Sequence, residues 1–168
     1  LAIPPRRGYA RAMTEPAPTI VVASELRRFV EAVFVASGLS ETHAAQVAAS
    51  LLYADLHGIE THGVARVPSY VARLERGLVA AGPEFTVEGS LAFAATLDGG
   101  NGMGAVVAQR AMDEVLARAA QTGIGVVLAK RSNHFGAAGF WARQAVPHGC
   151  IGICISPASR SLAPFGSR

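Results

Sequence analysis

The sequence predicts an α/β protein with two parts, a helical lobe over residues 24–80 and the start of a mixed α/β domain over 81–168. In the first part, apolar residues recur at helical spacing. In the second part, short apolar runs alternate with helical patterns, so that a strand, a helix and a strand follow one another. The pair Gly82-Pro83 separates the two patterns. A composition of 51% hydrophobic and 16% charged residues is typical of a chain with a packed core.

Three helices are expected in the helical lobe. The first starts at Ser24, which can cap its amides, and ends before Gly38. Ser40 can cap the second helix, which runs to about Gly58, and a third spans 68–76. The first helix has the clearest apolar stripe, formed by Leu26, Phe29, Val30, Val33 and Phe34. Because the link between the first two helices is short, they should pack as an antiparallel pair.

The second part is expected to begin with a β-hairpin. Its strands are residues 85–87 and 91–97, joined by the turn-like sequence Glu88-Gly89-Ser90. A glycine-rich turn over 98–102 then leads into a helix over about 103–120.

A strand, helix and strand follow this helix. Gly123 should end it, 124–129 should form a buried strand, 136–146 a helix of small residues, and 151–156 another apolar strand. This succession favours a partly parallel sheet, and we find neither an internal repeat nor a low-complexity tract.

The net charge of +3 comes from the first residues of the chain. We expect residues 1–23 to be a disordered leader, with Met13 a plausible start, and Arg6, Arg7 and Arg11 lie within it. Without these three arginines, the number of basic side chains equals the 12 acidic ones. The remaining chain is neutral, which argues against a nucleic-acid or membrane surface.

Cysteine usage points to a reducing compartment. Cys150 and Cys154 lie four residues apart on the same face of an expected strand, roughly 13 Å from one another, which is too far for a disulfide. Two buried thiols are therefore expected, together with a cytoplasmic location. No apolar run reaches the roughly 20 residues that a membrane helix needs.

The segment from Ala54 to Tyr70 has the composition of a substrate site. Thr61, His62 and Arg66 lie between a glycine break and a helix start, where functional side chains are often held. His62 could transfer a proton, Arg66 could bind a carboxylate through two hydrogen bonds, and Thr61 could orient either. Alternatively, Arg66 is a surface ion-pair partner and His62 a capping group.

A second candidate segment is Ser132-Asn133-His134-Phe135-Gly136, between an expected strand and an expected helix. Ligands favour that position in open α/β sheets. The helix dipole would favour an anion there and lower the pKa of His134, which could then move protons, while Asn133 could hold a substrate oxygen. The alternative, which the residue types favour equally, is that His134 caps the helix or fills the loop.

Two further patterns suggest other chemistry. His57 and His62 could be ligands of a metal-dependent hydrolase, but Gly58 intervenes and no carboxylate or cysteine cluster completes the set, so no metal is expected. The glycines of 100–104 are spaced GxGxG rather than GxGxxG, and no acidic residue ends a strand about 20 residues later. A tight turn at a helix start explains them better than a dinucleotide site.

Taken together, these motifs resemble a known family. The segments YADLHGIETHGVARVPSY, DGGNGMG, SNHFGAAGFWARQAVPHGCIGICISPAS and APFG are similar to the N-terminal half of the malate/L-lactate dehydrogenase family. That family is distinct from the classical Rossmann fold and includes ureidoglycolate, sulfolactate and diketogulonate oxidoreductases. The resemblance extends over about residues 24–166, and the family continues for about as many residues again, so this chain is expected to be a fragment.

The resemblance implies hydride transfer between NAD or NADP and C2 of a small 2-hydroxy or 2-oxo acid, in a homodimer. It makes His62 and His134 the candidates for proton transfer, with a preference for His134, and makes Arg66 a substrate group. Thr61 takes the place of a serine in the family's Ser-His-Gly motif. The two imidazoles and the guanidinium should then share one pocket.

Most cofactor contacts of the family are expected beyond residue 168. Four residues near the end of this chain could still touch the nicotinamide or its phosphates: Ser156, Ala158, Pro164 and Gly166. The alternative is an inactive truncated chain that binds a carboxylate or a partner subunit without catalysis.

Overall fold

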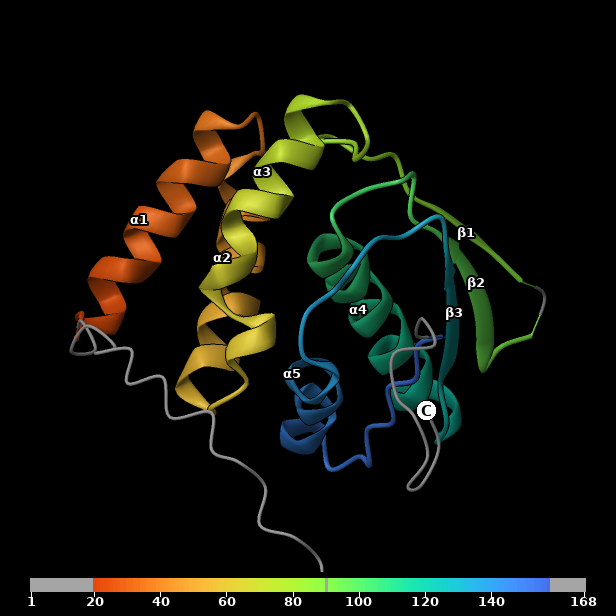
Figure 1. Ribbon diagram of the computed structural model, residues 1–168. Coiled ribbons are helices and arrows are strands. Elements are labelled where there is room, and N and C mark those ends of the chain that lie inside the picture. Colours follow the sequence, from red (N-terminus) through yellow and green to blue (C-terminus); the bar gives the residue numbers. More distant parts are fainter. Residues whose placement is uncertain (1–19, 90, 158–168) are drawn as a thin grey trace, which may run out of the picture.

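The computed structural model describes residues 20–89 and 91–157, which form a mixed α/β structure (Figure 1). In chain order its elements are α1 (Ala23–Ala36), α2 (Glu41–Leu56), η1 (Glu60–His62), η2 (Val64–Arg66), α3 (Val67–Glu75), β1 (Thr86–Glu88), β2 (Ala94–Asp98), α4 (Gly104–Thr122), β3 (Val126–Lys130), α5 (Ala138–Ala142) and η3 (Arg143–His148). The predicted fold class, helices first and a mixed α/β part after them, is confirmed.

The first two helices pack side by side, and their link confirms one predicted cap. The Ser40 hydroxyl accepts a hydrogen bond from the His43 amide at 3.2 Å, so Ser40 caps α2. The predicted cap at Ser24 is wrong, because α1 begins one residue earlier and has no side-chain cap. The carbonyl of Val22 closes the first turn by accepting from the amides of Glu25 and Leu26, which leaves Ser24 inside the helix.

The sheet has the strand order β1-β2-β3. Strands β1 and β2 form the predicted antiparallel hairpin, with Val87 opposite Leu97, while β2 and β3 run parallel. The parallel pairing requires a crossover, which α4 provides. Figure 1 shows α4 lying against the sheet, between it and the helices α2 and α3. Gly123, at φ 79°, ends α4 as predicted.

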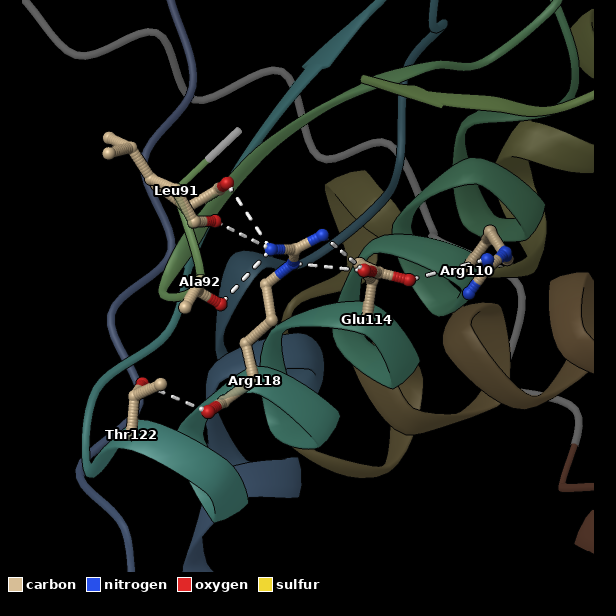
Figure 2. A network of polar contacts seen from close by, with 7 residues as sticks. Leu91, Ala92, Arg110, Glu114, Arg118 and Thr122 are labelled. Carbon is tan, nitrogen blue, oxygen red and sulfur yellow. Dashed lines mark hydrogen bonds and ion pairs between the residues drawn. The ribbon is translucent and has the colours of Figure 1, made fainter. Parts of the chain in front are cut away.

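One arginine ties α4 to the start of β2 (Figure 2). Arg118 donates from Nη1 to the carbonyls of Leu91, Ala92 and Ala94 at 2.9, 3.1 and 3.3 Å. Its Nε and Nη2 both lie 2.9 Å from Glu114, which also pairs with Arg110. Since only 18% of the Arg118 side chain is exposed, the guanidinium is largely shielded from water, and its bonds fix the hairpin against the helix.

A single hydrophobic cluster extends across the predicted lobe boundary at 80/81. It contains Phe34, Leu51 and Tyr70 from the helices before the boundary, and Met103 and Trp141 from the elements after it. The two predicted parts, 24–80 and 81–168, therefore share one hydrophobic interior, and their division into separate domains stays a prediction. None of the described helices is long and apolar enough to cross a bilayer.

The prediction of a buried strand over 124–129 is wrong about its burial. The strand is Val126–Lys130, and Leu128 is 67% exposed. The cause is the position of β3 at the edge of the sheet, where part of the strand has no covering layer within the described residues.

Two other predicted elements also differ. The helix expected over 136–146 is short, because α5 covers only Ala138–Ala142 and then tightens into η3, which contains Pro147. Residues 151–156 form no strand; Ile151, Ile153 and Ile155 are exposed, and no strand edge among the described residues pairs with them. The thiols of Cys150 and Cys154 are free and half-buried.

Candidate functional site

Two histidines from distant parts of the chain meet at the centre of the candidate site. The rings of His62 and His134 are stacked, with centroids 5.2 Å apart and an interplanar angle of 28°. His62 ends η1, and His134 lies in the loop between β3 and α5. The structure thus brings together the two segments that the sequence singled out, while the chemical roles of both rings stay predictions.

The loop that carries His62 is folded on itself. The Ile59 amide donates to Ala54 at the end of α2, and the two short helices η1 and η2 follow. The Thr61 hydroxyl lies 2.8 Å from Nδ1 of His62, and Nε of Arg66 donates to the Thr61 carbonyl at 2.6 Å. Among the described residues, the terminal nitrogens of Arg66 have no hydrogen-bond partner, so they are available to an anion.

Tyr70 is a site residue for which the sequence predicted no role. Its hydroxyl lies 2.6 Å from Nδ1 of His134, and its side chain is buried. Burial raises the pKa of Tyr70 to about 12, against the opposing charge of Arg66. The phenol therefore keeps its proton near neutral pH. A signal was present, because Tyr70 lies four residues after Arg66 at the start of a helix.

Burial and two charged neighbours lower the pKa of His134 below its usual 6.5. Partial removal of the ring from water is the largest cause, followed by the positive charges of Arg66 and His62. The lowered pKa was predicted, but its predicted cause was wrong. The helix α5 has only five residues and begins at Ala138, four residues after His134. The pKa of His134 is lowered instead by burial of the ring and by the nearby charges.

The pairing with Tyr70 leaves one nitrogen of His134 for chemistry. A phenol hydroxyl can donate to an unprotonated Nδ1 or accept from a protonated one. Tyr70 can therefore keep Nδ1 paired in either charge state of the ring, and Nε2 is left to exchange a proton with a ligand. With a lowered pKa, His134 is mostly neutral at pH 7, which suits a group that accepts a proton.

The amide of Asn133 is occupied by the protein. Its Oδ1 accepts from Arg73 of α3 at 3.0 Å, and its Nδ2 donates to the Gly102 carbonyl at 2.9 Å and to Asn101. Asn133 thereby joins α3 to the turn before α4 and to the His134 loop. Arg73 was missed by the sequence analysis, although it lies seven residues after Arg66 on the same face of a helix.

The enclosed space beside His134 is small. A cavity of about 30 Å³ is lined by Tyr70, Arg73, Val79, Met103, Gly104, Asn133 and His134. This volume suits a water molecule but not a nicotinamide ring. The described residues therefore do not by themselves enclose a nicotinamide.

The predicted cofactor contacts lie at the edge of the described chain. Ser156 is exposed, and its hydroxyl donates to the neighbouring Pro157 carbonyl at 3.3 Å. Ala158, Pro164 and Gly166 lie outside the described residues. A role of these four residues in cofactor binding stays a prediction.

The two alternative patterns have structural explanations. The ring of His57 stacks on Tyr53 and its Nδ1 lies 2.7 Å from the Tyr53 carbonyl. Over the described ranges, no three His, Cys, Asp or Glu side chains lie close enough together to hold a metal ion. The glycine-rich segment is a tight turn, in which Gly100 donates to Asp98 and has φ 55°.

Known proteins are similar to this chain in sequence. The chain is 38% identical to the malate dehydrogenase of Pyrococcus horikoshii over 146 residues, which are 87% of this chain and 41% of that protein. It is 36% identical to the NAD(+) ureidoglycolate dehydrogenase of Escherichia coli K12, over 84% of this chain and 40% of the relative. The chain thus spans about two fifths of the length of these relatives.

Solved structures agree with the sequence matches. The malate dehydrogenase structure from Pyrococcus horikoshii superimposes with a TM-score of 0.75 at 39% identity, over 77% of this chain and 37% of that one. The sulfolactate dehydrogenase from Methanocaldococcus jannaschii gives 0.75 at 30% identity, over 77% and 38%. The model of the family described as malate/L-lactate dehydrogenase matches residues 21–168. The resemblance seen in the motifs is thereby confirmed, and the chain belongs to the malate/L-lactate dehydrogenase family.

Proposed function

We propose that this chain supplies the acid-binding part of an oxidoreductase that transfers a hydride between NAD or NADP and C2 of a small 2-hydroxy or 2-oxo acid. The observation that carries the proposal is the stacking of His62 on His134, with the Tyr70 hydroxyl at Nδ1 of His134 and the charge of Arg66 acting on both His134 and Tyr70. The names of the relatives, malate and ureidoglycolate dehydrogenases, support the substrate class.

In this proposal His134 exchanges the proton of the substrate hydroxyl. When the acid is oxidised, the O–H bond at C2 breaks and its proton passes to Nε2 of a neutral His134 ring that carries its own proton on Nδ1. A bound nicotinamide would accept the hydride from C2. Tyr70 holds Nδ1 throughout. Reduction of a 2-oxo acid reverses the proton movement, and the nearby charge of Arg66 then favours its return to the substrate.

Arg66 is the proposed partner of the substrate carboxylate. Its Nε is held by the Thr61 carbonyl, so the two terminal nitrogens can point away from the loop as a pair of donors. His62 is the second candidate for the proton transfer, and Thr61 orients its ring through Nδ1. Asn133 supports the site rather than contacting the acid, since both ends of its amide are bonded to the protein.

The proposal extends to the setting of the enzyme. The bound nicotinamide supplies the hydride chemistry, and Ser156 is its one proposed contact among the described residues. We also propose a homodimer with a small-molecule substrate, as the family resemblance implies. The neutral charge balance after Met13 supports the proposal of no nucleic-acid or membrane partner, and the free thiols support a cytoplasmic location.

Spectroscopy with reduced cofactor tests the activity. The purified protein is mixed with NADH or NADPH and with a series of 2-oxo acids, and the absorbance of the reduced nicotinamide is followed. Loss of absorbance that depends on the acid, and that disappears in His134→Asn, supports the proposal. A loss that is unchanged in His134→Asn and His62→Asn would refute the assignment of both residues.

A binding protein without turnover is the second candidate. It is favoured by the small cavity beside His134, whose volume of about 30 Å³ is too small for a nicotinamide ring. Calorimetry with L-malate separates the two candidates. Binding of L-malate, together with no oxidation of NADH or NADPH by any 2-oxo acid in the absorbance assay, would favour the second candidate.

A further inference from the structure

The loop that carries His62 and Arg66 is held by an acidic residue of α2. Oδ2 of Asp55 accepts a hydrogen bond from the Val64 amide at 2.8 Å. Asp55 is the penultimate residue of α2, a helix whose neighbouring Ala54 and Leu51 are fully buried. The carboxylate therefore projects from a rigid element onto a loop nine residues further along the chain.

The Val64 amide is the first donor of η2, and the residue before it offers no side-chain cap. Gly63 occupies the N-cap position and lacks a side chain. Asp55 supplies the missing acceptor from outside the short helix, as a capping carboxylate does at the start of a longer one. Along the chain, Val64 lies between His62 and Arg66, so the contact holds the middle of the segment that carries both side chains.

Gly63 is needed here for space and not for its backbone conformation. Its φ of −89° is accessible to any residue. A Cβ on Gly63 would instead fall 1.7 Å from Oδ1 of Asp55 and 2.3 Å from its carboxyl carbon. The carboxylate thus fills the volume that a side chain at position 63 would need.

We propose that Asp55 is a positioning residue, which holds the loop 59–66 so that His62 lies against His134 and Arg66 points to the acid site. The expected effect of Asp55 on acid binding rests on the proposed function, whereas its role in holding the loop does not. The groups that act on His134 are its neighbours His62, Arg66 and Tyr70, and Asp55 acts through the first two.

Histidine NMR on the complete chain tests the inference with Asp55→Ala and Asp55→Asn. Both changes remove the negative charge, but the asparagine oxygen can still accept from Val64. In Asp55→Asn, we expect the Overhauser contact between the rings of His62 and His134 to persist. In Asp55→Ala, the contact should vanish and the pKa of His134 should rise towards 6.5, because His62 and Arg66 move away.

Loss of charge alone predicts a different result. Removing a nearby anion disfavours a protonated imidazole, so it would lower the pKa of His134 equally in both variants. Equal titrations of the two variants, or an intact contact between the rings in Asp55→Ala, would overturn the proposal. Asp113→Asn changes an exposed acidic residue of α4 and is the matched control. It should change neither the contact between the rings nor the pKa of His134.

Two further measurements keep the test decisive if Asp55→Ala does not fold. Gly63→Ala pushes the loop off the carboxylate and should also separate the rings, whereas Gly82→Ala, with no atom within 4 Å of the added Cβ, should not. In the unmodified chain, the Val64 amide should exchange slowly with solvent. Rapid exchange of that amide would overturn the proposal without any substitution.

Binding of L-malate shows whether the function fails separately. Asp55→Ala should weaken binding by about tenfold or more, the effect of losing one charge-assisted contact, while Asp55→Asn should restore most of it. If the unmodified chain binds no L-malate but the rings separate in Asp55→Ala, the proposed function fails and the positioning role stands. Unchanged binding in Asp55→Ala, with normal binding in the unmodified chain, would overturn the functional role.

Discussion

The Tyr70 hydroxyl lies 2.6 Å from Nδ1 of His134, and this contact joins α3 to the loop after β3. It fixes which nitrogen of His134 can reach a ligand, because Nδ1 is already paired. It also places a buried phenol, with a pKa of about 12, beside an imidazole whose pKa is lowered. The two groups therefore both stay uncharged at neutral pH, beside the positive charge of Arg66.

Tyr70→Phe should leave the fold intact and release His134. The phenyl ring can fill the buried position of Tyr70, so the loss of stability should be about that of one hydrogen bond, ~1 kcal/mol. Nitrogen-15 shifts of His134 should then show a mixture of the two neutral tautomers. Tyr53→Phe is the control, since within the described residues no hydrogen bond involves its hydroxyl; an unchanged tautomer in Tyr70→Phe would refute this role.

Arg66→Ala should chiefly weaken acid binding. Loss of a charge-assisted contact costs about 1.5–3 kcal/mol, equivalent to roughly a ten- to hundredfold rise in the dissociation constant for L-malate. Arg66→Lys should recover only part of this, because an ammonium group cannot make the paired contact. Calorimetry measures both, with the exposed Arg76→Ala as control. Equal affinity in Arg66→Ala and the parent chain would exclude a carboxylate contact.

The titration of His134 should depend on Arg66 and appear in the stability of the chain. Its folded pKa lies below 6.5, so between these values the unfolded state binds more protons. The neutral His134 ring therefore contributes to the free energy of unfolding. This contribution is complete above pH 6.5 and is lost as the pH falls through the pKa of His134 in the folded chain. Arg66→Ala should raise the pKa of His134 in an NMR titration. It should also flatten the rise of the urea midpoint between pH 5 and 7, and a steeper rise would contradict the assignment.

The sequence predicted the parts of the fold that depend on neighbouring residues. The stripe that includes Phe34 predicted the first helix, and Ser40 predicted the cap of the second. Position relative to helix and strand ends was enough to select His62 and His134 as candidates. Whether two such segments meet depends on how the helices pack against the sheet, and no local pattern encodes that packing.

The errors have the same physical origin. Apolar side chains of 124–129 and 151–156 predict burial, but burial requires a covering layer, which Leu128 and Ile153 lack among the described residues. The hydroxyl of Tyr70 and the guanidinium of Arg73 were overlooked because their partners, His134 and Asn133, lie far along the chain. Helical spacing placed these side chains on one face, but it did not show what that face meets.

Separate substitution of the histidines should identify the one that transfers the proton. In a protein preparation that oxidises L-malate or another 2-hydroxy acid, His134→Asn should remove the acidic limb of the pH–rate curve and lower kcat more than KM changes. His62→Asn should retain that limb, with its midpoint shifted higher, because the charge of His62 lowers the pKa of His134. Loss of the limb only in His62→Asn would reverse the two assignments.

Arg118→Ala should destabilise the chain without touching the candidate site. The guanidinium joins Glu114 to the carbonyls of Leu91, Ala92 and Ala94, and these acceptors would lose a shielded partner (Figure 2). We expect a loss of about 1–3 kcal/mol in the free energy of unfolding by urea. The matched control is Arg27→Ala, which removes an exposed pair with Glu31 and should cost about 0–1 kcal/mol. Equal losses in the two variants would mean that the helix-to-hairpin contacts of Arg118 contribute no more than a surface ion pair. Histidine titrations that are unaltered in Arg118→Ala would show that Arg118 stabilises the chain without affecting the candidate site.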